Sequence, residues 1–112
     1  GLLVPITRGY NLTHLALQIN LPLIIVSPIQ IGILNHTLLT ISIARQRGLK
    51  VAGVILNPVH ERRLDTIEEE QGSLIEELSD TPILGTCPYI HDVSSEGVIQ
   101  NLALIQKQFH QI

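Results

Sequence analysis

The sequence is poor in aromatic residues, in cysteine and in charge. It contains no tryptophan, one phenylalanine and two tyrosines, so its core must be built from aliphatic side chains. A single cysteine excludes an internal disulfide framework and is consistent with a reducing compartment, so we expect a cytoplasmic location. The net charge of −3 comes without long like-charge runs, which argues against a basic footprint for nucleic acid.

Long hydrophobic runs are missing as well. The longest apolar stretch, residues 21–34, is interrupted by prolines and a glycine and is too short to span a bilayer, so we expect no membrane partner. No basic segment precedes an apolar N-terminal run, so no signal peptide is visible. The chain starts at Gly1 without an initiator methionine, and we expect it to be a fragment or a trimmed chain.

The sequence does contain enough aliphatic material for one domain. Leucine and isoleucine provide 35 of the 112 residues, and apolar residues make up 45% in all. Such a composition can bury a core and excludes disorder for most of the chain. The length suits a single domain spanning residues 1–112.

Strand-like and helix-like patterns alternate along the chain. Continuous aliphatic runs predict strands, and apolar positions three or four residues apart predict helices. The run 23–26 is typical of a strand buried on both faces. The predicted strands are 2–6, 23–26, 51–56 and 83–86, and the predicted helices are 14–19, 36–47, 64–78 and 96–112. This alternation predicts an α/β fold, a parallel sheet flanked by helices.

Three residues mark the expected helix ends. Thr13 and Asn35 stand where helix N-caps are expected, and Gly48 stands where the second long helix should end. Asn35 has a second interpretation, because the free N–H groups and positive dipole of a helix N-terminus suit a carboxylate or a phosphate. From these considerations alone, the capping role is favoured.

The motifs of several catalytic sites are missing. There is no G-x-x-x-x-G-K-[ST] phosphate loop, no G-x-G-x-x-G fingerprint and no G-x-S-x-G elbow. The five histidines are not spaced with one another or with Cys87 in a way that indicates zinc. We therefore predict no catalytic and no metal-binding residue within this chain.

Ligands of parallel sheets bind at the carboxyl ends of the strands, where two residues are of interest. Asn57 follows a buried strand, and its amide can donate and accept at once, so it could read a base such as adenine; a turn before Pro58 explains it equally well. Tyr89 could flank a planar ligand or cover the sheet edge. Cys87 is expected to be a small buried side chain, and Glu96 suits the dipole of the last helix without any function.

Several segments, taken in order, resemble the second half of dethiobiotin synthase. They are residues 1–6, 21–26, 31–40, 51–57 and 82–89. The stretch 32–40 is the most specific, whereas the strand before Asn57 and the Leu-Gly…Pro pattern are shared with related P-loop amidoligases and synthases. The resemblance implies a P-loop NTPase-like fold from which the P-loop half is missing.

The resemblance also implies a function. Dethiobiotin synthase uses ATP and Mg²⁺ to close a ureido ring on 7,8-diaminopelargonic acid with CO₂, in biotin biosynthesis. It is a homodimer, and its phosphate loop, its substrate lysine and its magnesium ligands lie in the N-terminal half that this chain lacks. We therefore expect the piece alone to be inactive. Four apolar positions of the helix 36–47 suit a dimer face: Leu38, Leu39, Ile41 and Ile43.

Carried over residue by residue, the resemblance gives two sets of site residues. The family holds the substrate carboxylate at the start of the dimer-face helix, which favours the binding role of Asn35 over the capping role. The corresponding residues here are Gly32, Ile33, Leu34 and Asn35. The nucleotide-binding residues would be Asn57, which reads adenine, the flanking Pro88, Tyr89 and Ile90, and, with looser spacing, Glu96.

Two other interpretations of the function of this chain remain open. The chain could be a non-catalytic dethiobiotin-synthase-like module that regulates or oligomerises another enzyme, or a relative of the cobyrinic acid amide synthases. The sequence upstream of Gly1 would separate them, because a P-loop followed by a Lys-x-x-x-Lys pair favours the synthase. A fused downstream domain would favour the module, and an amidotransferase domain after Ile112 would favour the amide synthase.

Overall fold

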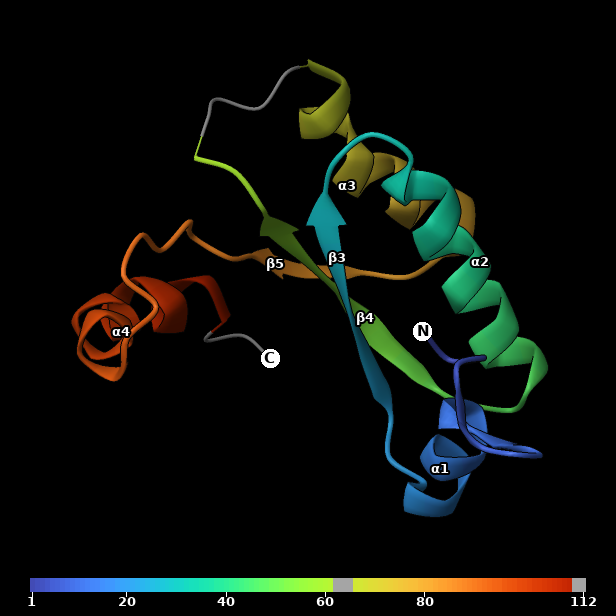
Figure 1. Cartoon of the computed structure of the whole chain (residues 1–112). Coiled ribbons are helices and arrows are strands. Elements are labelled where there is room, and N and C mark those ends of the chain that lie inside the picture. The colour runs from blue at the N-terminus through green and yellow to red at the C-terminus, as the bar shows by residue number, and fades with distance from the viewer. Residues whose placement is uncertain (62–65, 110–112) are drawn as a thin grey trace.

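The computed structural model describes residues 1–61 and 66–109 (Figure 1). No helix within these ranges is long and apolar enough to cross a membrane. The elements in chain order are β1 (Pro5–Thr7), β2 (Tyr10–Asn11), α1 (Leu12–Ile19), β3 (Leu23–Ile29), α2 (Ile33–Gln46), β4 (Val51–Pro58), α3 (Thr66–Ser79), β5 (Ile83–Thr86) and α4 (Ser95–Phe109).

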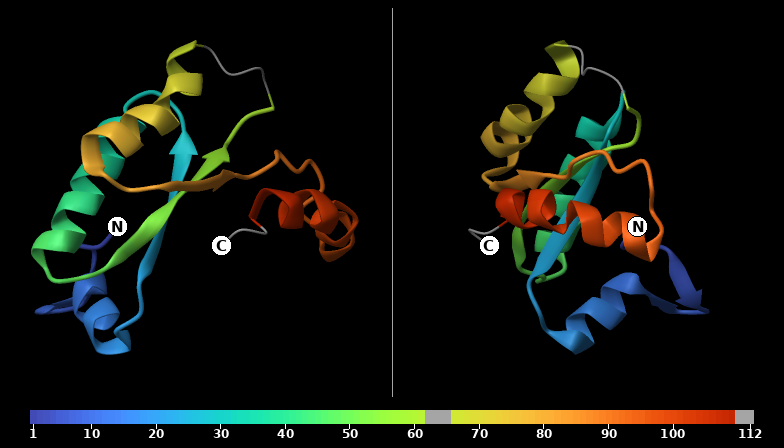
Figure 2. Two further views of the ribbon diagram at one scale, coloured as in Figure 1. Left: turned by 180° about the vertical axis from the view of Figure 1, so that it is seen from behind. Right: turned by 90° about the vertical axis from the view of Figure 1, so that its left-hand side faces the viewer.

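The central sheet is parallel and consists of β3, β4 and β5, with β4 in the middle. Leu56 of β4 lies opposite Ser27 of β3 and Thr86 of β5, so the carboxyl ends of all three strands point to one edge. α2 and α3 lie together on one side of the sheet, whereas α4 lies on the other side near the end of β5 (Figures 1 and 2). This arrangement confirms the predicted α/β class.

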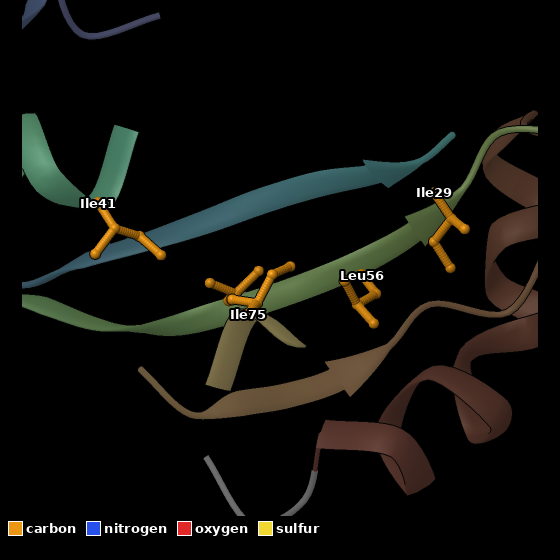
Figure 3. Packing of buried hydrophobic residues seen from close by; sticks show 5 residues of the cluster. Ile29, Ile41, Leu56 and Ile75 are labelled. Carbon is orange, nitrogen blue, oxygen red and sulfur yellow. The ribbon is translucent and has the colours of Figure 1, made fainter. Parts of the chain in front are cut away.

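The core lies between the sheet and the pair α2 and α3 (Figure 3). It is aliphatic, as the lack of aromatic residues predicts, and its buried members are Ile29, Ile41, Val54, Leu56 and Ile75. Gly72 of α3 is part of this contact, because a Cβ atom there would lie 3.1 Å from Leu56 Cδ1. The missing side chain lets α3 approach β4 closely.

The predicted first strand does not belong to the parallel sheet. β1 instead pairs antiparallel with β2, with Thr7 opposite Tyr10, and the two form a separate hairpin. The reason is the short Arg8-Gly9 connection, in which Gly9 has φ +78°. A two-residue turn with positive φ favours a hairpin, whereas a parallel partner needs a long crossover.

Both predicted N-caps are wrong. Asn11 caps α1, since its Oδ1 accepts from the backbone N–H of Thr13 (3.0 Å) and of His14 (3.3 Å). Thr13 is buried and donates its hydroxyl proton to the carbonyl of Leu2 at 2.8 Å. Gly32, with φ +85°, precedes α2, so Asn35 lies inside the first turn rather than at the cap.

The predicted burial of β3 on both faces is wrong for one face. Ser27 and Ile29 point into the core, but Ile24 and Val26 are 45% and 59% exposed. Within the two described ranges, β4 is the only strand that pairs with β3. An apolar strand thus has one uncovered face and one open edge.

The other boundaries agree more closely with the sequence pattern. β5 covers the predicted residues 83–86, and β3 and β4 extend past their predicted ends to Ile29 and Pro58. Gly48, with φ +81°, follows the end of α2 as predicted. Residues 64–65 and 110–112, at the ends of two predicted helices, lie outside the described residues.

Candidate functional site

A cleft of about 370 Å³ opens at the carboxyl ends of β4 and β5. It contains four of the five residues predicted to bind a nucleotide. Its lining consists of Asn57, Pro58, Cys87, Pro88, Tyr89, Ile90, Val93 and Ile105. The cleft therefore joins the ends of two strands, the loop after β5 and one residue of α4.

The β4–β5 ladder positions the two walls of the cleft. The backbone N–H of Cys87 donates to the carbonyl of Leu56 at 2.8 Å, which holds the turn after β5 beside Asn57. Leu56 is buried in the core, so its neighbour Asn57 lies on the opposite face of the strand. Pairing of adjacent strands thus brings together residues that are about 30 positions apart in the sequence.

Asn57 is half-buried and keeps its amide available. No residue in the described ranges forms a hydrogen bond with its side chain, so the alternative in which the amide closes a turn before Pro58 is not observed. A partly desolvated amide with free donor and acceptor atoms can bind a ligand that offers both complements.

The walls of the cleft are mainly apolar. Two prolines and aliphatic side chains line it, and the ring of Tyr89 meets that of His91 edge to face, with centroids 5.2 Å apart. Burial raises the pKa of the Cys87 thiol above its ordinary value, because desolvation disfavours the thiolate. A neutral, planar group is the kind of ligand that such walls accommodate.

A contact between a histidine and a carboxylate, which the sequence analysis missed, lies across two loops at this edge of the sheet. His91 Nε2 lies 2.6 Å from Glu61 Oε1, and both side chains are exposed. The pair links the segment after β4 to the segment after β5. Thirty residues separate the partners, so no local pattern could have revealed it.

Glu96 does not line the cleft. It is exposed in the first turn of α4, where Ser94 Oγ accepts from the backbone N–H of Gly97 at 3.2 Å. Asp92 accepts from the backbone N–H of Ser94 at 2.9 Å, and hydrogen bonds to Ser94 lower the pKa of the Asp92 carboxyl. These contacts are those of a helix start, and Glu96 lies beside them as the acidic residue of the first turn.

The four residues predicted to hold a carboxylate lie at the start of α2: Gly32 precedes the helix, and Ile33, Leu34 and Asn35 belong to its first turn. Ile33 is buried, Gly32 and Asn35 are exposed, and Ile33 N–H donates to the carbonyl of Gln30 at 3.3 Å. The first N–H groups of a helix lack partners within the helix, here at Leu34 and Asn35. Since Ile29 lies opposite Pro58, this turn and the cleft lie on the same edge of the sheet.

One member of the predicted dimer face is misassigned. Ile41 is 1% exposed and belongs to the core, so it cannot contact a partner. Leu39 is 55% exposed and lines a groove of about 510 Å³ between α2 and α3, which also contains Asn35 and Leu78. The outward face of α2 is therefore narrower than the sequence indicates.

The described residues offer no metal centre. No group of three or more histidine, cysteine, aspartate or glutamate side chains within 1–61 and 66–109 is placed to hold an ion. The carboxylate oxygens that Mg²⁺ prefers are not clustered within these two ranges.

A parallel sheet flanked by helices, with the candidate residues at its carboxyl edge, defines an α/β domain of the kind that places ligand sites at this edge. A family model described as an AAA domain matches residues 1–97, and the chain belongs to this family. The match agrees with the predicted P-loop NTPase-like fold.

The resemblance to dethiobiotin synthase is confirmed by curated relatives. The chain is 35% identical over 114 residues to the ATP-dependent dethiobiotin synthetase BioD of Bacillus subtilis (strain 168), covering 96% of this chain and 49% of the relative. The proteins of the same name from Bacillus cereus strains G9842 and ATCC 14579 are 39% and 43% identical over 102 residues, covering 90% of this chain and 42% of each relative. The chain thus spans about half the length of the relatives it matches.

Proposed function

We propose that this chain provides the adenine-binding and substrate-carboxylate-binding parts of an ATP-dependent dethiobiotin synthase, an enzyme of biotin biosynthesis. The reaction closes a ureido ring on 7,8-diaminopelargonic acid with CO₂. The observation that supports it most directly is the cleft in which Asn57 meets the turn Pro88-Tyr89-Ile90. The similarity to relatives bearing that name supports the choice of reaction.

The base-binding role follows from the chemistry of the cleft. Adenine offers a ring nitrogen that accepts and an amino group that donates, and an asparagine amide complements both at once. The prolines and Ile90 would cover the two faces of the ring, and the open side toward exposed Tyr89 would leave room for the ribose. Glu96 is proposed only as an outer contact with the nucleotide, since it lies outside the lining.

The carboxylate-binding role follows from the start of α2. Gly32 allows the left-handed turn that exposes the first helical N–H groups, and the helix dipole favours an anion there. Leu34 and Asn35 would donate their backbone N–H groups to the carboxylate, and the Asn35 amide would add a side-chain donor. Ile33, whose own N–H is taken by Gln30, would fix the turn by its burial.

Phosphoryl transfer requires parts that this chain does not carry. It depends on positioned cationic groups and on Mg²⁺ around the phosphates, and the sequence has no P-loop. We propose that the N-terminal half of a full-length protein supplies them. The open edge of β3 and its exposed Ile24 and Val26 provide a surface against which such a half can pack.

We further propose a homodimer that uses the outward face of α2. Exposed Leu39 and Leu78 flank the groove that contains Asn35, so a partner seated there would approach the carboxylate site. A site completed by a partner recurs twice about a two-fold axis.

The test is an activity assay on the full-length protein. Diaminopelargonate, ATP, Mg²⁺ and bicarbonate are expected to give dethiobiotin, detected by mass spectrometry, and residues 1–112 alone are expected to give none. ATP binding without dethiobiotin would favour the non-catalytic module instead. Amidation of a cobyrinic acid carboxylate by the same protein would favour the amide synthase.

A further inference from the structure

Gln71 is a buried polar residue that the functions above do not use. It lies on α3 and is only 4% exposed, yet its side chain reaches the turn between β3 and α2. Its Nε2 donates to the carbonyl of Gln30 at 3.1 Å. The same carbonyl accepts from the N–H of Ile33, the first residue of α2, at 3.3 Å. One carbonyl group therefore joins α3 to the start of α2.

The burial of Gln71 has no explanation in packing alone. Its Oε1 is buried and forms no hydrogen bond. On folding, this oxygen therefore loses its hydration without gaining a hydrogen-bond donor. A buried polar atom without a partner is unfavourable, and an apolar side chain of similar length would fill this position with less desolvation. The part of the amide that is satisfied is the donor to the turn.

The turn that Gln71 contacts is flanked by buried Ile29 and Ile33, but its central residue Gly32 is not fixed by packing. Gly32 has φ +85°, and a Cβ atom there would meet nothing within 4 Å, so side-chain packing does not fix this residue. Within the described ranges, the Gln30 carbonyl, with its two donors, is the hydrogen-bonded anchor of the turn. The direction of the Leu34 and Asn35 N–H groups depends on the path of this turn.

We infer that Gln71 is a positioning residue for the carboxylate site: it fixes the Gln30 carbonyl so that the first N–H groups of α2 converge on the substrate's carboxylate. This inference rests on the proposed function and goes beyond it, because Gln71 touches neither ligand. Its effect should fall on the diamino acid and not on ATP, since the base cleft is built from β4, β5 and α4.

The experiment uses Gln71→Met in the full-length protein. Methionine keeps the length of the side chain and removes the donor to Gln30. We expect the KM for diaminopelargonate to rise by about tenfold, the effect of one lost hydrogen bond. The KM for ATP should stay within about twofold, because the cleft does not depend on this bond. Gln71→Glu should raise the KM for diaminopelargonate further, since it places a carboxylate against the Gln30 carbonyl.

Ile75→Val is the matched control. Ile75 lies one turn along α3 in the same core and is fully buried, so its truncation loosens the packing of α3 without touching the turn. The control should leave both KM values near those of the wild type. A Gln71→Met protein with an unchanged KM for diaminopelargonate, or a rise shared by both substrates and by Ile75→Val, would overturn the inference.

A second measurement does not depend on activity. Amide hydrogen exchange at Ile33, whose N–H donates to the Gln30 carbonyl, should be faster in Gln71→Met than in the wild type and in Ile75→Val, because the anchor of the turn is lost. Equal exchange in all three proteins would overturn the positioning role. If the wild type formed no dethiobiotin, the proposed function would fail, and the exchange rates would still decide whether Gln71 anchors the turn.

Discussion

Cys87 and Leu56 are joined by a backbone hydrogen bond of 2.8 Å just beyond the end of β5. This bond fixes the turn Pro88-Tyr89-Ile90 beside Asn57 without involving any of their side chains. A substitution at Asn57 therefore changes the chemistry of the cleft while its walls stay in place. The role of the Asn57 side chain can therefore be tested separately from that of the turn after β5.

Asn57→Ala in the full-length protein should weaken ATP binding by about 1–3 kcal/mol, because one partner of a desolvated amide pair is lost. Discrimination against GTP should fall with it, since an amide oriented to pair with N1 and the amino group of adenine would oppose N1–H and O6 of guanine with like groups. Isothermal titration calorimetry measures both. Asn35→Ala removes the same amide from the other site and should leave the affinity for ATP unchanged. An unaltered preference for ATP over GTP in Asn57→Ala would remove the base-reading role.

Cys87, the one cysteine of the sequence, should report on ligand entry into the cleft. Its pKa is raised by burial, so alkylation by iodoacetamide should become fast only above the pH at which free cysteine reacts. The pKa shifts upward because burial favours the neutral thiol in the folded state, and the thiolate is the form that reacts. ATP should slow the alkylation further by covering the cleft, whereas diaminopelargonate alone should not. Equal rates with and without ATP would place the nucleotide elsewhere.

Gly53 and Gly72 should respond differently to alanine. A Cβ at Gly53 would lie 2.5 Å from Leu84 Cγ and 2.8 Å from the carbonyl oxygen of Pro82, which is backbone and cannot move aside easily. We expect Gly53→Ala to lower the free energy of unfolding by about 1–3 kcal/mol. At Gly72 the nearest atom is the end of the flexible Leu56 side chain, and alanine favours a helix by about 1 kcal/mol, so the net change should be small. Urea denaturation followed by circular dichroism measures both; a similar loss in the two variants would contradict this difference.

Features set by neighbouring residues could be read from the sequence. β5 and the end of α2 at Gly48 agree with the predictions, because aliphatic runs and a glycine after a helix act locally. The convergence of Asn57 with Pro88 also followed from a rule, since carboxyl ends of parallel strands share an edge. The ligands came from the resemblance to a family, because strand and helix patterns do not specify what a site binds.

Features that depend on contacts between residues far apart in the sequence could not be predicted from local patterns. The apolar run of β3 looks buried on both faces, but its burial depends on what lies beside it, and Val26 is exposed. Asparagine is a residue type common at helix N-caps, but the positive φ of Gly32 lets α2 begin at Ile33, two residues before Asn35. Gln71 gave no signal at all, because its contact with Gln30 joins residues 41 positions apart.

Asn35→Asp should separate ligand binding from helix stability. Asn35 lies in the first turn of α2, where a negative charge interacts favourably with the helix dipole, so the variant should be as stable as the wild type or more stable by about 0.3–1 kcal/mol. The same charge would repel the carboxylate of diaminopelargonate. The KM for this substrate should therefore rise strongly while the KM for ATP stays near that of the wild type.

A neutral substrate tail provides the control for this charge effect. The methyl ester of diaminopelargonate carries no charge at that end, so wild type and Asn35→Asp should use it with similar KM values. Steady-state kinetics give the KM values for the acid and the ester, and a thermal unfolding curve gives the stability of the variant. If Asn35→Asp left the KM for the free acid unchanged, or raised it equally for acid and ester, no carboxylate would bind at the start of α2. Asn35 would then be an exposed residue in the first turn of α2, where the dipole alone explains a polar side chain.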